Sequence, residues 1–186
     1  MASSEERSLG DNFDDSSIST EISNMYLKDE TKGLFKDVVV RVREGRVLLI
    51  GRTDRTEVAL EAVRLAWLAA GVKEVINNIE VGPKGTNFLN YAKDNFVETQ
   101  IETRLLATKG IRSVNYTVEV VDSVAYILGV AQNEEERHNV AYIASITQGI
   151  TRVVSYVRLR NDPIRLEKTG QLRGKNADTA SGGVRP

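Results

Sequence analysis

Hydrophobic residues follow two different periods along the chain, and each period occurs twice. An apolar residue at every fourth position, the helical period, occurs at Ile18, Ile22 and Tyr26 and again at Val97, Ile101 and Leu105. The two-residue period of a half-buried strand occurs at Val38, Val40 and Val42 and again at Tyr116, Val118 and Val120. The pattern therefore predicts a helix followed by a strand in each half of the sequence.

The two halves resemble one another residue by residue. A displacement of 78 residues superimposes seven identical residues in order, namely Val40 on Val118, Val42 on Val120, Gly51 on Gly129, Glu57 on Glu135, Ala66 on Ala144, Gly71 on Gly149 and Val75 on Val153. Upstream, a displacement of 79 pairs Ile18 with Val97, Thr20 with Thr99, Ile22 with Ile101 and Leu27 with Leu106. Similarity at a fixed spacing indicates one folding unit that occurs twice.

Each copy continues with a hairpin and a second helix. Tight turns are predicted at Glu44-Gly45 and Asp122-Ser123, and the returning strands at 46–50 and 124–128. Second helices are predicted to begin near Asp54 and Asn133, each with a glutamate three residues later, and to end at Gly71 and Gly149. Last strands follow at 75–81 and 153–159.

The fold class predicted from this order is α+β, with two αββαβ modules. In each module we expect two helices on one face of a three-stranded mixed sheet. The predicted organisation is a flexible segment 1–16, a first module 17–81, a linker 82–92, a second module 93–160 and a disordered tail 161–186. Modules of about 64 residues are marginally stable alone, so we expect the two to pack together.

Composition excludes several classes of function. The 25 basic and 26 acidic residues give a net charge of −1, so we expect no nucleic-acid partner. The absence of cysteine excludes disulfides, thiol nucleophiles and thiolate metal sites. Gly82-Pro83-Lys84-Gly85 has the GXXG spacing of a loop that clamps nucleic acid, but it follows a strand and does not join two helices. We interpret it as part of the linker.

The repeated pattern resembles the BON domain family. Its features are a glycine that ends the hairpin, a glutamate six residues later, an alanine-rich helix and the run from Gly71 to Ile79. The second half has Ser155 and Tyr156 where the first has Asn77 and Asn78. The resemblance covers residues 18–159 and is closest to dual-BON outer-membrane lipoproteins in the segment 93–106.

This resemblance implies a non-catalytic protein of the cell envelope. Its relatives are periplasmic, attached to the outer membrane by a lipid on an N-terminal cysteine, and bind anionic phospholipid through the first helix of the second domain, which supports envelope integrity. This sequence contains no cysteine, so either the anchored residue lies outside it or the protein has no anchor. The alternative is a periplasmic protein-interaction or chaperone-like module with envelope proteins as partners.

The candidate lipid-binding residues lie at the start of the second module. Phe96 stands where the first copy has Ser17, one position away from the apolar stripe, so its ring is expected to face away from its own sheet. Aromatic and basic residues on one helix suit a membrane interface. We therefore predict a lipid-binding set of Phe96, Tyr91, Lys93, Arg104 and Lys109, with Phe88 and Leu89 just upstream. The competing interpretation is that Phe96 packs between the modules or staples the helix start.

Two other side chains have more ordinary interpretations. Trp67 stands opposite Ser145 in the repeat, and a large aromatic flanked by alanines favours packing between the modules. His138 follows three glutamates and an arginine on a helix, with no nucleophile or second ligand near it, which favours a solvated helical face over catalysis. We therefore expect no catalytic residue, no metal site and no cofactor.

Overall fold

The computed structural model describes residues 9–28, 38–83 and 91–168, without the side chains of residues 9–14, 91, 92 and 168. The first half contains α1 (Leu9–Lys28), β1 (Val38–Arg43), β2 (Arg46–Thr53), α3 (Thr56–Leu68) and β3 (Glu74–Val81). The second half contains α4 (Tyr91–Ala107), η1 (Ser113–Asn115), β4 (Tyr116–Val121), β5 (Val124–Ala131), α5 (Glu134–Ser145) and β6 (Arg152–Leu159), and α6 (Pro163–Lys168) follows.

The strands form two separate three-stranded sheets with the same topology. The orders are β1-β2-β3 and β4-β5-β6. In each sheet the first two strands form an antiparallel hairpin, and the last strand runs parallel to the central one. The predicted α+β fold class and the mixed sheet of each module are confirmed.

Both hairpin turns are held by an aspartate from the preceding helix. Glu44 and Gly45 have φ values of 53° and 73°, and the equivalent Asp122 and Ser123 have 53° and 62°. The two carboxylate oxygens of Asp15 accept hydrogen bonds of 2.8 Å from the backbone N–H groups of Glu44 and Gly45. These bonds offset the strain that a left-handed backbone imposes on residues other than glycine.

Asp94 has the same role in the second module. Its carboxylate oxygens accept from the N–H groups of Asp122 and Ser123 at 3.0 and 3.4 Å. Because Asp94 lies 79 residues after Asp15, this contact is part of the repeat.

The glycines predicted to follow the second helices have two functions. Gly71 and Gly149 adopt φ values of +88° and +99°, as the prediction required. A Cβ at Gly71 would lie 3.2 Å from Ile18 Cδ1, and one at Gly149 would lie 3.0 Å from Val97 Cγ2. Each glycine therefore also lets the first helix of its module pack closely.

The starts of the two second helices differ. Asn133 Oδ1 accepts from the N–H of Glu136 at 2.8 Å, which confirms the predicted cap of α5. The predicted cap at Asp54 is wrong, because α3 begins two residues later, after Arg55, which makes no side-chain capping bond.

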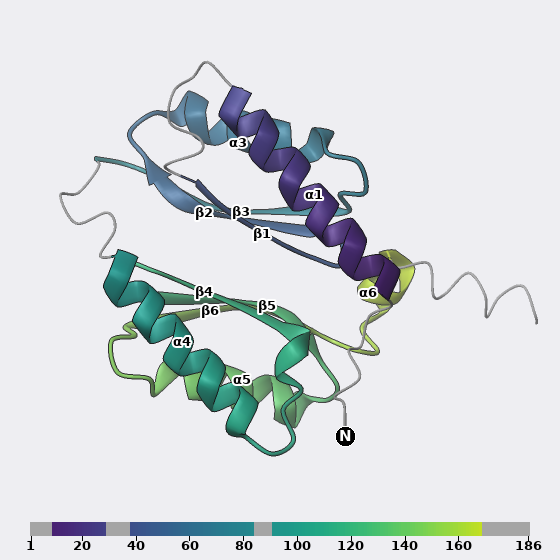
Figure 1. Ribbon diagram of the computed structural model, residues 1–186, viewed down its shortest axis with the longest axis vertical. Helices are drawn as coiled ribbons and strands as arrows, with labels where there is room; N and C mark the ends of the chain where they lie inside the picture. The colour runs from purple at the N-terminus through teal and green to yellow at the C-terminus, as the bar shows by residue number, and fades with distance from the viewer. Residues whose placement is uncertain (1–8, 29–37, 84–90, 169–186) are drawn as a thin grey trace, which may run out of the picture.

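The two sheets face each other, and the helices cover the outer faces (Figure 1). Each module has its own core between helices and sheet. A third cluster joins the inner faces of both sheets and contains Leu48, Ile50, Val121, Tyr126 and Leu128. The modules therefore pack together, as their small size predicted.

Polar contacts cross the same interface. Arg43 Nε donates to the carbonyl oxygen of Asn115 at 2.9 Å, and Arg46 Nη1 donates to that of Tyr156 at 2.9 Å. Arg158 pairs with Glu74 at 2.8 Å. Strands of both modules therefore contribute to the interface between them. Its centre is apolar, and polar and ionic contacts surround that centre.

Two predicted boundaries are wrong. Helix α1 begins at Leu9, inside the predicted flexible segment 1–16, because Asp15 on its second turn holds the hairpin. Helix α6 lies inside the predicted disordered tail 161–186. It is held by buried Arg165, which forms a bidentate ion pair with Glu44 of the first module, with contacts of 2.9 and 2.6 Å. The rest of both predictions, at 1–8 and 169–186, lies outside the described residues.

Among those described, none of the helices combines the length and apolar content that a membrane crossing requires.

Candidate functional site

Helix α4 has one buried face and one exposed face. Val97, Ile101 and Leu105 point into the core of the second module and are almost fully buried. Phe96 precedes this stripe by one residue, which is a rotation of about 100° around the helix. Its side chain is 65% exposed, so the ring faces away from its own sheet.

Basic residues share this exposed face. Lys93 lies one turn before Phe96, and Arg104 lies two turns after it, both exposed. Lys109, also exposed, follows the end of the helix. The structure therefore brings Lys93, Phe96 and Arg104 together on one helix surface, which we call the α4 surface. The side chain of Tyr91, like residues Phe88 and Leu89, lies outside what the structure describes.

The sequence analysis missed Leu106, whose side chain is 74% exposed near the end of α4. It borders an apolar groove of about 230 Å³ whose lining includes Val114 and Val118. The signal was its position one residue after Leu105, about 100° around the helix from the end of the stripe that Val97, Ile101 and Leu105 form. Leu27 of α1, its counterpart in the repeat, is also exposed.

Two of the three acidic residues of α4 are engaged by the second sheet. Asp94 is used by the hairpin turn. Glu98 accepts from the N–H of Val120 at 3.2 Å on the edge of β4, and burial raises the pKa of its carboxyl. These contacts engage two carboxylates, while Glu102, the third acidic residue of α4, remains exposed.

Three positions of the first helices differ in chemistry between the two copies. The residues 79 positions before Lys93, Phe96 and Gln100 are Asp14, Ser17 and Glu21. One helix therefore carries a basic, an aromatic and a neutral side chain where its counterpart carries two acids and a serine. At these positions the divergence places a basic and an aromatic residue on the second copy, although Glu98 and Glu102 there also replace Ser19 and Ser23.

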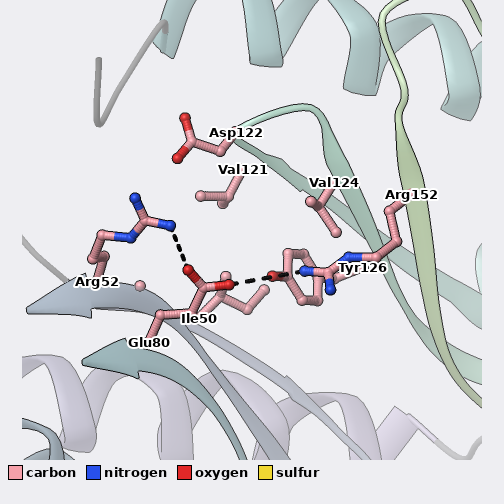
Figure 2. Close-up of a pocket in the computed structure, with 9 residues that line it drawn as sticks. Ile50, Arg52, Glu80, Val121, Asp122, Val124, Tyr126 and Arg152 are labelled. Atoms are coloured by element: carbon pink, nitrogen blue, oxygen red, sulfur yellow. Dashed lines mark hydrogen bonds and ion pairs between the residues drawn. The ribbon is translucent and has the colours of Figure 1, made fainter. Parts of the chain in front are cut away.

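A cleft between the modules lies beside the start of α4. It has a volume of about 260 Å³ and is lined by β2, β3, β5, β6 and the second hairpin turn. Figure 2 shows Arg52 and Arg152, one from each module, reaching the same Glu80 carboxylate. Asp122, on the rim, takes no part in this pairing. Its backbone N–H donates to the carboxylate of Asp94, which connects the cleft to α4.

A family model for the BON domain matches residues 14–83 and again residues 93–161. These ranges include both sheets, α3 and α5, and most of α1 and α4. The chain belongs to the BON domain family. Both the duplication and the family resemblance that the sequence predicted are confirmed.

Relatives with the same arrangement extend over most of the chain. An uncharacterized protein in the gshII 5′ region of Anaplasma centrale is 38% identical over 153 residues, which cover 82% of this chain and 99% of that protein. The outer membrane lipoprotein DolP of Haemophilus influenzae is 28% identical over 148 residues, which cover 80% of this chain and 76% of DolP. The chain is thus similar to a dual-BON protein of the DolP type.

Similarity to solved structures is lower. CdsD, a structural protein of the type III secretion system of Chlamydia trachomatis, is 16% identical with a TM-score of 0.32. The match covers 78% of this chain and 63% of that one. A likeness this low carries no argument about function.

The prediction for Trp67 is wrong. Trp67 lies on α3, which covers the outer face of the first BON domain, and its side chain is 52% exposed (Figure 1). Because the domains meet through the inner faces of their sheets, a residue on an outer helix is too far away to pack between them. The aromatic residues of the interface are Tyr126 and Tyr156.

His138 lies on the exposed side of α5, as predicted. It borders a shallow pocket of about 330 Å³ together with Glu134, Arg137 and Ser155. Arg137 and Glu134 pair with each other at 2.6 Å. Within the described ranges, no group of three or more histidine, aspartate or glutamate side chains is arranged to hold a metal ion.

Proposed function

We propose that this protein is a non-catalytic, envelope-associated protein whose second BON domain docks on anionic phospholipid through the α4 surface. The observation that carries the proposal is the exposed ring of Phe96 beside Lys93 and Arg104, where the first domain has Ser17. The outer-membrane location of the relative DolP supports an envelope role. Support of outer-membrane integrity from the periplasmic side belongs to the same proposal.

The expected binding energy indicates that the α4 surface binds lipid only weakly by itself. Burying one aromatic side chain contributes about 2 kcal/mol, and each basic residue near an anionic surface about 1 kcal/mol. The sum of about 4 kcal/mol corresponds to a dissociation constant near the millimolar range. Contact of this strength is effective when another link, such as a lipid anchor, already holds the protein at the membrane.

Vesicle sedimentation tests the proposal. At accessible lipid concentrations of about the millimolar dissociation constant, the wild-type protein is expected to sediment with phosphatidylglycerol vesicles and to remain in solution with phosphatidylcholine vesicles. Phe96→Asp should weaken sedimentation at least about tenfold, because it replaces an inserted ring with a charge that anionic lipid repels. Leu60→Asp is the matched control, since Leu60 is also 65% exposed but lies on α3.

Equal sedimentation with both lipids would contradict the proposal. So would an equal loss in the two variants, because α3, the helix that carries Leu60, lies on the opposite side of the molecule from α4 (Figure 1). Circular dichroism of each variant should match the wild type, since both substituted residues are largely exposed.

The second candidate function is a periplasmic protein-interaction or chaperone-like module. The exposed side chains of Leu60, Trp67 and Leu68 favour it, because their spacing places them on one side of α3. A partner that is retained after Phe96→Asp but lost after Trp67→Ala, from a protein that binds no vesicles, would establish this function in place of the first.

A further inference from the structure

The cleft between the two BON domains exists only because the domains are joined. Arg52 and Glu80 are the next-to-last residues of β2 and β3 in the first domain. Tyr126 on β5 and Arg152 at the start of β6 belong to the second. Ile50, Val121 and Val124 give it an apolar floor (Figure 2). Neither domain alone supplies both walls.

One carboxylate serves two guanidinium groups in this cleft. Arg52 Nη2 contacts Oε2 of Glu80, and Arg152 Nη2 lies 3.8 Å from Oε1 of the same residue. Glu80 therefore occupies the position of an anion between two arginines from different domains. Its side chain is half exposed, so it can turn outward into water at little cost.

The chemistry of an oxyanion fits this position. A phosphate group presents more oxygen acceptors than a carboxylate and accepts paired hydrogen bonds from guanidinium groups. The second acidic residue of the lining is Asp122, on the rim. The negative charge of Asp122 repels anions. Removal of this charge should therefore also strengthen phosphate binding.

The cleft is linked to α4 through the second hairpin turn. Asp94 on the first turns of α4 holds the N–H of Asp122, which lines the cleft, and Phe96 follows two residues later.

We propose that the interdomain cleft is a phosphate-binding site in which Arg52 and Arg152 take the phosphate group and Glu80 is displaced. The assignment of that phosphate to a phospholipid headgroup rests on the proposed function of α4. The alternative source is a free phosphate ester, and the experiment separates the two.

The test is a titration of the full chain with inorganic phosphate and, separately, with glycerol 3-phosphate. Binding is monitored through the backbone amide NMR signals. Signals of the cleft residues should shift on saturation. Arg152→Gln should weaken binding about tenfold, because it removes one charge-assisted contact. Glu80→Gln should strengthen it severalfold, because it removes the competing anion. Arg137→Gln, which breaks an exposed ion pair on α5, is the matched control and should change nothing.

The gain in Glu80→Gln distinguishes a binding site from a structural ion pair, whose loss would only destabilise the fold. Absence of shifts in the cleft, or equal affinities of Arg152→Gln and Arg137→Gln, would overturn the site. Thermal unfolding of each variant shows that the comparison is made on folded protein.

Vesicle binding by the same variants identifies the source of the phosphate. A loss with Arg152→Gln as well as with Phe96→Asp supports the headgroup. A loss with Phe96→Asp alone overturns the headgroup assignment and leaves the proposed function intact. Binding of soluble phosphate by a protein that binds no vesicles would refute the lipid function and support the cleft as a site for a free phosphate ester.

Discussion

Phe96 and Trp67 show how far the residue scale follows from sequence. The helical period alone places Phe96 outside the core stripe, and its 65% exposure agrees. The prediction for Trp67 was wrong, because packing between the domains depends on which sheet faces meet. The periodicity of α3 does not indicate which faces these are. Leu106 was predictable in principle from the period of α4.

Glu119 is the residue whose ionisation should affect stability most. It lies on β4 and pairs with Arg41 of β1 across the domain interface, with Glu98 and Glu102 of α4 nearby. Burial is the largest cause that raises the pKa of its carboxyl to about 7, and Arg41 opposes the shift. The folded state therefore binds a proton that the unfolded state releases near pH 4.3.

The sign of the pH dependence follows from this raised pKa. The stabilising contribution of protonated Glu119 is complete below about pH 4.3 and is lost as pH rises through about 7. We expect Glu119→Gln to be more stable than the wild type at pH 8, by up to roughly 3 kcal/mol, with the difference vanishing near pH 4. Urea unfolding at several pH values measures this, and a difference that does not vary with pH would contradict it.

At the scale of elements, hairpins and helices were predictable from local patterns, whereas the outer ends of α1 and the existence of α6 were not. The period-2 strands and the turn residues Asp122 and Ser123 specify a hairpin within a few residues. The start of α1 depends on Asp15, whose partner is 29 residues away, and α6 depends on the contact of Arg165 with Glu44, 121 residues away. Local sequence does not encode partners at such distances.

The aspartate that caps each hairpin gives a prediction at this scale. Asp94→Ala removes two acceptors from the partly buried turn contact of the second domain and leaves two N–H groups without them. We expect a loss of about 2 kcal/mol in the free energy of unfolding, measured with urea. Asp94→Asn retains one acceptor oxygen and should lose about half as much. Equal stability of the wild type and Asp94→Ala would show that the contact does not hold the turn.

At the scale of the whole molecule, the sequence indicated a duplication but not how the copies meet. The signal was present in the central strands. In β2 the run from Val47 to Ile50 is apolar on both faces, which is typical of a strand that is covered on both sides. One face meets its own helices, and the other, with Leu48 and Ile50, meets Tyr126 and Leu128 of the second sheet.

This arrangement directs the helices of the two domains to opposite sides of the molecule (Figure 1). A flat membrane therefore contacts the outer helices of one domain at a time. The α4 surface and the exposed side of α3, with Trp67, cannot rest on the same bilayer. The domain that carries the aromatic and basic residues on its first helix is the one expected at the lipid.

Paramagnetic broadening tests this orientation most directly. Bicelles that contain phosphatidylglycerol and a lipid with a spin-labelled headgroup should broaden the backbone amide signals of 93–104 on α4 most strongly, and those of α1 and α3 far less. Broadening that is equal on α1 and α4, or strongest on α3, would contradict docking through the second BON domain.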